Sequence, residues 1–184
     1  MEPLEIAKRL QEKFSDEVKE VKEYGGQASV IMKKERVRDV VAYLKTEPEL
    51  QMDLLRDLCG VDYFEKKTPR FEVVYHLYSV ALRHLIRLRV EVPEDDSAID
   101  SIVPLHIGAD WHERECYDMF GISFNGHPDL RRILLPDDWE GHPLRKDYPL
   151  RGPSEEHEWL RFKHVVEKSK DCKQYEWQCP EDAS

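Results

Sequence analysis

The sequence lacks the patterns that mark membrane spans, secretion signals and the common nucleotide-binding loops. No apolar run approaches the roughly 20 residues that a helix needs to cross a bilayer. The first residues, MEPLEIAKRLQEKF, have no apolar centre of the kind found in signal peptides. No GxGxxG, P-loop or GxSxG pattern occurs either. We therefore expect a cytoplasmic protein that does not bind nucleotides or dinucleotides through such loops.

Positive charge and cysteine are also scarce. Lys and Arg number 28 against 38 Asp and Glu, which gives a net charge of −10 at pH 7 and a pI of about 5.3. General binding to nucleic acid, which needs a basic surface, is not expected. The four cysteines, Cys59, Cys116, Cys172 and Cys179, form no CxxC pair and fit no iron–sulfur or zinc spacing. We expect reduced thiols, although Cys172 and Cys179 are close enough in sequence to pair or to bind a metal.

What the sequence does contain indicates an α+β fold. Apolar residues recur at helical spacing over residues 3–14, 35–45 and 50–59, and Gly60 ends the third stretch. A β-like run covers 28–32, and alternation over 71–78 and 86–92 predicts a hairpin whose second strand has a polar face. We predict a small antiparallel or mixed sheet with helices on one face and water on the other, followed by an extended irregular C-terminal arm.

The stretch from residue 110 to residue 152 is the most informative part of the chain. A helix is predicted over about 110–120, with Asp110 as N-cap, Glu113 completing a capping box and Gly121 ending the helix at positive φ. One face of this helix is apolar and contains His112, Cys116, Met119 and Phe120. The other face is of mixed charge, so part of it needs a partner, and it contains Trp111, Arg114, Glu115 and Asp118.

Beyond this helix the periodicity stops, and turns follow one another among apolar residues. A segment this apolar should be ordered, so we expect an arm that lies over its own domain or over another protein. Two Gly-His-Pro turns, at 126–128 and 141–143, each precede basic residues. The similarity is either a coincidence between two turns or a repeated arrangement that suits pairing with carboxylates of a partner. The predicted division is a sheet domain at 1–93, a linker and short helix at 94–109, the helix and arm at 110–152, and a tail at 153–184. In the linker, Ser97 is expected to cap a helix that Pro104 stops.

Residues that could carry chemistry have plainer structural explanations. His106, His112 and Cys116 are the best candidates for metal ligands. The pattern is explained better by buried histidine and a cysteine in the apolar core. Glu113, Glu115 and Asp118 could serve as acid and base. A helix cap for Glu113, and ion pairs with arginines such as Arg114, Arg131 or Arg132 for the other two, explain these residues better. The residues alone therefore favour an assembly subunit without a cofactor, because arginine and aromatic residues are enriched at interfaces.

Four runs of the sequence carry a resemblance to one known family. They are ERE at 113–115, DMFGI at 118–122, GHPDLRRIL at 126–134 and PDDWEGHPLRKDYPL at 136–150. They resemble the C subunit of the proton-translocating NADH:quinone oxidoreductase, respiratory complex I. Cys116, where an aliphatic or aromatic residue is expected, is a minor departure. The signature positions on these runs are Glu113, Arg114, Glu115, Asp118, His127, Arg131, Arg132, Trp139, His142 and Arg145.

The resemblance implies a chain without a redox centre or catalytic residues, in the quinone-reducing module of the complex. FMN and iron–sulfur clusters would lie in partner subunits. The implied partners are the D subunit, which forms the quinone site, and the iron–sulfur B and I subunits. The implied location is peripheral, on the cytoplasmic side of the bacterial plasma membrane, with membrane contact only through the complex. The signature positions are then structural and interface residues.

Two alternatives stay open on the sequence alone. Membrane-bound nickel–iron hydrogenases and F420- or ferredoxin-linked relatives carry similar subunits, and the electron donor binds other chains. A free-standing zinc hydrolase using His106, His112 and Cys116 is the alternative from another class.

Overall fold

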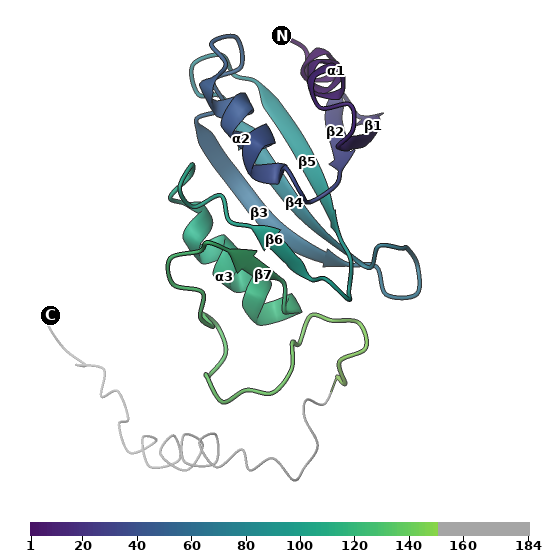
Figure 1. Cartoon of the computed structure of the whole chain (residues 1–184), viewed down its shortest axis with the longest axis vertical. Coiled ribbons are helices and arrows are strands. Elements are labelled where there is room, and N and C mark those ends of the chain that lie inside the picture. Colours follow the sequence, from purple (N-terminus) through teal and green to yellow (C-terminus); the bar gives the residue numbers. More distant parts are fainter. Residues whose placement is uncertain (151–184) are drawn as a thin grey trace, which may run out of the picture. The chain divides into compact units, whose positions relative to one another are not determined.

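The structure is a computed structural model, and it describes residues 1–150. The predicted tail at 153–184, with Cys172 and Cys179, lies outside the described residues. Figure 1 shows the arrangement of the elements. In chain order they are α1 (Pro3–Lys13), β1 (Val18–Tyr24), β2 (Gln27–Met32), α2 (Val37–Thr46), β3 (Leu54–Asp62), β4 (Phe71–Tyr78), β5 (Leu85–Val92), β6 (Ala98–Asp100), α3 (Ala109–Phe120) and β7 (Ser123–Asn125).

Five of these strands form a mixed sheet in the order β1-β2-β5-β4-β3. The pair β2–β5 is parallel and the other neighbours are antiparallel. The predicted hairpin is therefore β4–β5, in which Tyr75 lies opposite Leu88. Its inward residues, such as Phe71, Tyr75 and Leu88, are fully buried, because alternation places one side of each strand against the core.

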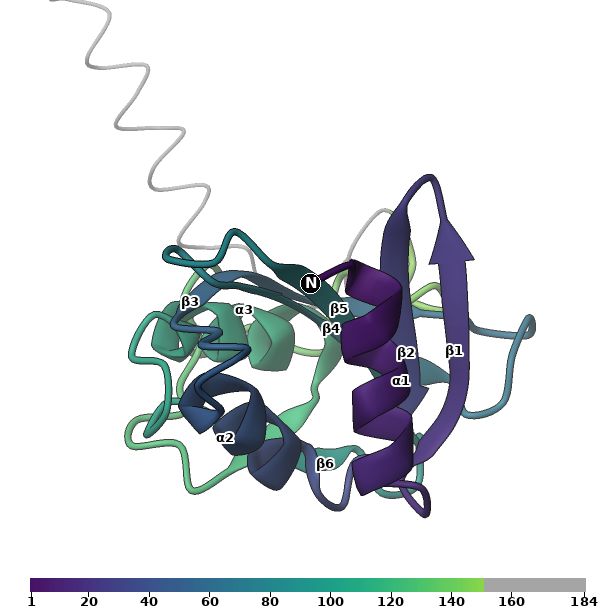
Figure 2. The same cartoon turned by 90° about the horizontal axis from the view of Figure 1, so that it is seen from above.

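The three helices of the described region lie on one side of this sheet, as Figure 2 shows. Ile6 and Leu10 of α1, and Val40 and Leu44 of α2, are fully buried in the same core as the inward strand residues. Apolar residues three and four positions apart form one stripe along a helix, and the sheet covers this stripe on α1 and on α2. The predicted α+β class, with helices on one face, is confirmed.

The predicted helix at 50–59 is wrong, because most of this stretch is strand β3. Leu54, Leu55 and Leu58 fit a helical stripe, but only Leu58 is buried, opposite Tyr75 of β4. Gly60 is not a helix stop. A Cβ atom at Gly60 would lie 2.6 Å from the Phe120 ring, so this glycine lets α3 pack closely on β3.

The predicted short helix after Ser97 is also wrong. Residues 98–100 form β6, which pairs in parallel with β7, and Ser123 N–H donates to Ser97 C=O at 2.8 Å. Strand β1 had no sequence prediction. It pairs with β2 across the Gly25-Gly26 turn, and both glycines have positive φ. The apolar residues of β1, Val18, Val21 and Tyr24, lie three positions apart and not two, so the strand shows no alternation.

The sheet face opposite the helices is polar, as predicted, but part of it is covered by ion pairs. Glu72 on β4 is fully buried and pairs with Lys67 and with Arg89 on β5. Lys67 also pairs with Glu91, which Lys19 of β1 approaches at 2.5 Å. Long side chains thus cover a row of carboxylates that the strand pattern alone leaves open to water.

Candidate functional site

Helix α3 is the element around which the signature positions gather. The predicted helix over 110–120 is confirmed as Ala109–Phe120, and Gly121 follows it with φ +73°. The predicted capping box is wrong, since Gly108 is the N-cap and no side chain caps the helix. Glu113 is instead fully buried, and its Oε1 accepts a hydrogen bond from Ile102 N–H at 2.8 Å. The chain before the helix folds back over Glu113, which helical spacing alone does not reveal.

Asp118 organises the contact between α3 and the arm, which we define as residues 126–150. Its side chain is fully buried, and one oxygen, Oδ2, accepts the backbone N–H groups of Ile133, Leu134 and Leu135 at 3.1, 2.8 and 2.9 Å. The other oxygen, Oδ1, accepts Arg132 Nη1 at 2.7 Å. A carboxylate with these donors tolerates burial because its acceptor sites are occupied.

These donors also set the titration of Asp118. Burial by itself would raise the pKa of this carboxyl group. The hydrogen bonds from Leu135, Arg132, Leu134 and Ile133 outweigh burial and hold its pKa below the ordinary value. Asp118 is therefore ionised at neutral pH and acts as an anionic anchor for the arm.

Arg132 extends this contact along the arm. Its Nη2 donates to Trp139 C=O at 2.8 Å and to Gly141 C=O at 3.2 Å, while Nη1 faces Asp118. The planar guanidinium thus fixes three segments at once, as a rigid fork of donors allows. The predicted ion pair between Asp118 and an arginine is therefore confirmed, and the arginine is Arg132 of the same chain.

The two Gly-His-Pro turns lie against opposite ends of α3. His127 Nδ1 accepts Asp129 N–H at 3.0 Å, so the proton is on Nε2, which donates to Asp110 C=O at 3.2 Å. His142 Nδ1 lies 3.0 Å from Asp118 C=O and donates to it, because a carbonyl oxygen can only accept. The two turns therefore play similar parts, although the histidines use different nitrogens.

Two further arginines close the contact. Arg145 Nε donates to Phe120 C=O at 2.6 Å, and its guanidinium lies 5.2 Å from the centre of the Phe71 ring on β4. Arg114 of α3 reaches the other way and donates to the carbonyl oxygens of Arg131 and Arg132 at 3.2 and 3.0 Å. Helix α3 and the arm thus each donate side-chain hydrogen bonds to the backbone of the other.

A second ionic cluster, not predicted from the sequence, ties the end of the arm to the sheet. Buried Asp62 pairs with Arg70 through both oxygens, at 3.0 and 2.9 Å, and also accepts Lys146 N–H at 2.8 Å. Arg70 binds Asp147 at 2.6 Å and Glu94 at 2.6 Å as well. The pKa of Asp62 is lowered, since these hydrogen bonds outweigh its burial. Only the DxxxxxxxR spacing of 62 and 70 across the β3–β4 loop hinted at this pair.

Glu113 is the signature residue with the most unusual environment. Burial raises its pKa to about 7, although hydrogen bonds from Ser101 and Ile102 oppose the rise. Among residues 1–150, neither Glu113 Oε2 nor the buried Tyr75 hydroxyl has a hydrogen-bond partner. The carboxyl group can therefore hold a proton near neutral pH, but it faces the core and not an open cleft.

The metal candidates do not form a site in the described region. No three His, Cys, Asp or Glu side chains of residues 1–150 are placed to hold a metal ion. His106 is buried, His112 faces Asp57 at 3.7 Å, and Cys116 is buried with its thiol pKa raised by that burial. The zinc hydrolase alternative has no supporting geometry in residues 1–150.

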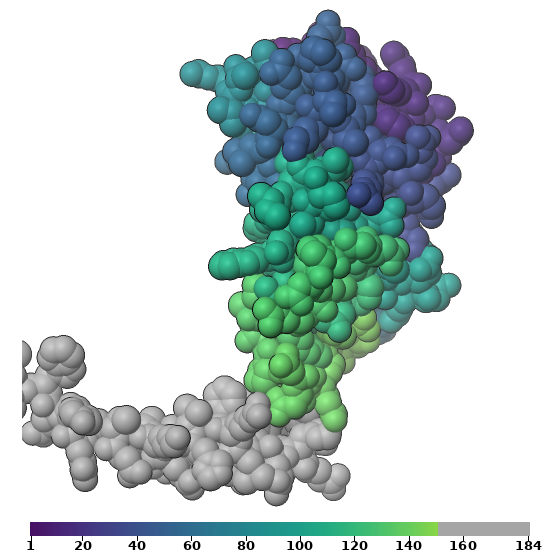
Figure 3. Space-filling view, turned by 60° about the vertical axis from the view of Figure 1, so that its left-hand side comes forward, coloured from purple at the N-terminus to yellow at the C-terminus, as the bar shows by residue number. Residues whose placement is uncertain are grey.

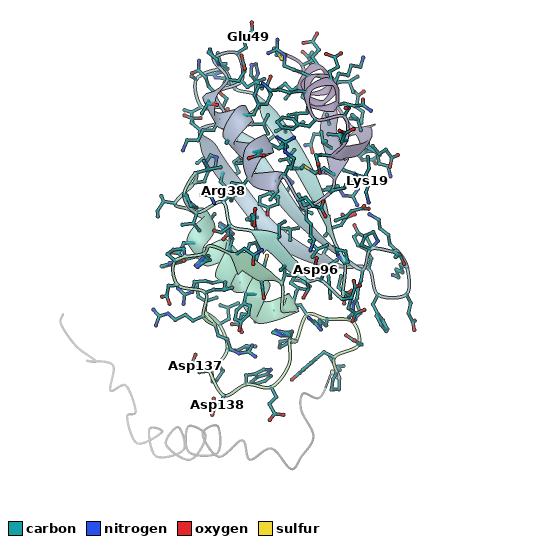
Figure 4. All side chains as sticks on the ribbon, viewed as in Figure 1. Lys19, Arg38, Glu49, Asp96, Asp137 and Asp138 are labelled. Carbon is teal, nitrogen blue, oxygen red and sulfur yellow. The ribbon has the colours of Figure 1, made fainter. Side chains whose placement is uncertain are left out.

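What the arrangement offers chemically is a rigid outer surface. With their polar groups bonded inward, the arm and α3 expose the apolar side chains of Leu134, Leu144, Leu150 and Trp111. Arg131 and Glu115 are also exposed, and within residues 1–150 the ion pair of Arg131 is with Asp129 at 2.9 Å. Figure 4 shows Asp137 and Asp138 on the turn of the arm that lies away from the sheet. Such a mixture of apolar residues and charges suits an interface with another protein.

Comparisons with known proteins agree on one family. Residues 30–154 match the family described as the respiratory-chain NADH dehydrogenase, 30 Kd subunit. The chain is 48% identical over 148 residues to the C subunit of the NADH-quinone oxidoreductase of Geobacter sulfurreducens, covering 80% of this chain and 90% of that protein. It is 52% identical over 145 residues to the subunit of the same description from Roseiflexus castenholzii, covering 79% and 83%.

Solved structures share the fold. A trypsin-resistant fragment (1–134) of Nqo5 has a TM-score of 0.60 at 32% identity and covers 68% of this chain and 98% of the fragment. A chain of a membrane-bound sulfane sulfur reductase, an archaeal respiratory membrane complex, has a TM-score of 0.65 at 22% identity, covering 98% and 95%. The second likeness concerns the fold alone.

Proposed function

The chain belongs to the family of the 30 Kd subunit of respiratory-chain NADH dehydrogenase, and on that premise we propose that it is a non-redox structural subunit of an NADH:quinone oxidoreductase. Its place is in the quinone-reducing module. There it supports electron transfer from NADH through FMN and iron–sulfur centres to quinone, coupled to proton translocation. The chain itself contributes no catalytic residue.

The observation that carries this proposal is the fourfold bonding of Asp118 to the arm. Four hydrogen bonds to one buried carboxylate order residues 132–135, and Leu134 in that segment then points away from the core. An ordered segment that exposes apolar side chains lowers the entropic cost of binding a partner. A catalytic role would need the polar groups to face a substrate, but Asp118, Arg132 and His142 bond to backbone groups of their own chain.

The partners we propose are the quinone-site D subunit and the iron–sulfur B and I subunits. The exposed surface of the arm, with Leu134, Leu144 and Arg131, is the surface that would meet the quinone-site subunit. In the space-filling view the green arm is continuous with the teal surface around α3, so one partner could contact both (Figure 3). FMN and the iron–sulfur clusters would be bound by other subunits of the complex.

The proposed location is peripheral, on the cytoplasmic side of a bacterial plasma membrane. No helix within residues 1–150 is long and apolar enough to cross a membrane. The membrane contact we propose is therefore made by other subunits of the complex.

The test is purification of the tagged full chain from its own cells in mild detergent. The eluate is assayed for flavin, iron, nickel and zinc and for NADH-dependent quinone reduction. We expect flavin and iron–sulfur subunits in fixed ratio with this chain, together with quinone reduction that depends on NADH. Nickel with hydrogen uptake would contradict NADH as donor and favour the hydrogenase-type complex. A lone chain with stoichiometric zinc would overturn the proposal.

A further inference from the structure

A cleft of about 670 Å³ lies between the start of β3 and the loop that leads into α3, beside Gly126 and Pro128 at the start of the arm. Leu54 and Leu55 line one side, and the loop residues 103–108 line the other. Lys45, at the end of α2, stands at its edge and donates to Leu105 C=O. The walls are mainly aliphatic, with few polar groups, as in sites that receive a side chain or a small ligand.

His106 supplies a polar atom of this cleft that lacks a partner. The side chain is nine-tenths buried or more, and its Nε2 has no hydrogen-bond partner among residues 1–150. The ring donates a hydrogen bond to the backbone carbonyl of Asp53, and the donor is Nδ1 because Nε2 has no partner. Burial and then the nearby Lys45 ammonium lower the pKa of His106 to about 4, so the ring is neutral at pH 7. Nε2 is therefore a lone-pair acceptor that awaits a donor.

The mouth of the cleft exposes large apolar side chains. Ile107, which also lines the cleft, is 79% exposed. Leu54 across the cleft is 43% exposed. An apolar rim around a buried polar acceptor is the arrangement of a protein contact, in which a central pocket takes an anchor residue.

We propose that this cleft receives a segment of a partner polypeptide, which inserts an apolar side chain beside a neutral hydrogen-bond donor for His106. The donor is a hydroxyl or an amide N–H. A cationic donor is disfavoured, because the Lys45 ammonium is close enough to affect the ring and makes no ion pair within residues 1–150. The exposed apolar side chains at the mouth favour a polypeptide over a free small molecule, which would leave Ile107 and Leu54 in water.

The contact at this cleft rests on the proposed function, because we take its partner to be another subunit of the same assembly. It differs in chemistry from the attachment of the arm. The arm is held to α3 by ionised groups, whereas this contact depends on a neutral imidazole that lines the cleft.

The experiment uses the tagged full chain in its own cells. Ile107→Glu places a charge at the mouth of the cleft, and His106→Leu removes the acceptor while keeping an apolar filling. Tyr24→Glu, at an exposed position at the end of β1 that does not line the cleft, is the matched control. Each variant is purified in mild detergent and the co-purified subunits are quantified. In parallel, a benzophenone amino acid at position 107 is photo-crosslinked and the joined peptide is sequenced.

We expect Ile107→Glu and His106→Leu to lower subunit recovery about tenfold or more, since a lost anchor or an unpaired donor costs at least a factor of ten. Tyr24→Glu should recover subunits as the wild type does, and the crosslink should join position 107 to another subunit. Wild-type recovery by both cleft variants, or a crosslink only to lipid or to a second copy of this chain, would overturn the inference. Failure of the wild-type chain itself to recover subunits would instead refute the proposed function.

Discussion

The sheet region and the arm are stabilised by different forces. In the sheet region, Tyr75, Leu77 and Leu88 are fully buried and pack with apolar side chains of the helices. In the arm, Leu130 and Leu135 are only partly buried against the core, and Leu134 and Leu150 are exposed. The arm is held chiefly by hydrogen bonds to charged groups. The first kind of stabilisation is spread over many contacts, whereas the second is concentrated in a few side chains.

This difference teaches how one chain can combine a stable domain with an exposed apolar surface. An arm attached by hydrophobic burial would have to hide Leu134 and Leu144. Attachment through Asp118, Arg132 and His142 leaves those leucines available to a partner. Variants that remove one kind of stabilisation at a time can separate the two, and their expected effects differ in size.

The largest effect is expected from Asp118→Ala. It leaves the amides of Ile133, Leu134 and Leu135 and the guanidinium of Arg132 without their acceptor. Removing one partner of a buried charged pair costs about 3–5 kcal/mol. We expect a loss of this size in the free energy of unfolding, measured by urea titration at pH 7.

Leu88→Ala is the control from the sheet region. It should cost about 2–5 kcal/mol by leaving a cavity. Limited proteolysis separates the two variants. Asp118→Ala should be cleaved first within residues 126–150, while Leu88→Ala should lose protection across the whole chain. Identical cleavage patterns would mean that the arm is part of the same cooperative core.

Next in size is the pH dependence due to Glu113. Its folded pKa of about 7 exceeds the ordinary 4.5, so the folded state binds the proton more tightly than the unfolded state. The associated stability is present below pH 4.5 and is lost as pH rises through 7. One pKa unit corresponds to about 1.4 kcal/mol, so the loss approaches about 3 kcal/mol.

Glu113→Gln, which has no charge to lose, should abolish this pH dependence. We expect the variant to match the wild type near pH 5 and to exceed its free energy of unfolding by about 2–3 kcal/mol at pH 8.5. Denaturant titrations at both pH values measure this. Parallel curves for the two proteins would show that Glu113 does not titrate in this range.

A smaller effect is expected from Gly121→Ala. The residue has φ +73°, and its Cβ would lie 2.5 Å from His142 Nε2 and 2.7 Å from Arg145 Nη2. The strained backbone alone costs about 1–2 kcal/mol, and both side chains must move. Thermal unfolding should show this loss. Gly108→Ala, at φ −62° with open space around its Cβ, should be neutral or slightly stabilising, and an equal loss there would refute the steric explanation.

The smallest effect on stability is expected from Arg131→Ala. The side chain is 67% exposed and, among residues 1–150, pairs with exposed Asp129, so the free energy of unfolding should change by less than about 0.5 kcal/mol. If the arm faces a partner, recovery of the other subunits should nevertheless fall several-fold. Arg38→Ala, on the exposed side of α2, should leave both quantities unchanged (Figure 4). Unchanged recovery for Arg131→Ala would remove this residue from the interface.

Periodicity predicted the parts of the fold that are built by periodic burial. The helices near 3–14, 35–45 and 110–120 and the hairpin of β4 and β5 follow from it. It failed for β3, where Leu54, Leu55 and Leu58 imitate a helical stripe in an edge strand that α3 covers. It also failed for β6, a strand of three residues whose partner β7 follows 22 residues after it ends.

The site was predicted in composition but not in geometry. Asp118 was assigned to a face that needs a partner, and it is in fact fully buried. The partner is residues 132–135 of the same chain, which return to α3 through turns that have no period. Glu113 was wrongly assigned to a helix cap. The loop at 101–102 that covers it has no periodic pattern either, so the sequence did not show that Glu113 is buried. Contacts between irregular segments leave no spacing in the sequence.

Attachment of the arm through Asp118 is tested most directly by amide hydrogen exchange on the isolated full chain at pH 7. We predict slow exchange at Ile133, Leu134 and Leu135, because each of these amides donates to Asp118 Oδ2. In Asp118→Asn the same three amides should exchange at least tenfold faster while Tyr75 and Leu88 stay protected. Fast exchange of the three amides in the wild type would contradict the claim that this carboxylate holds the arm.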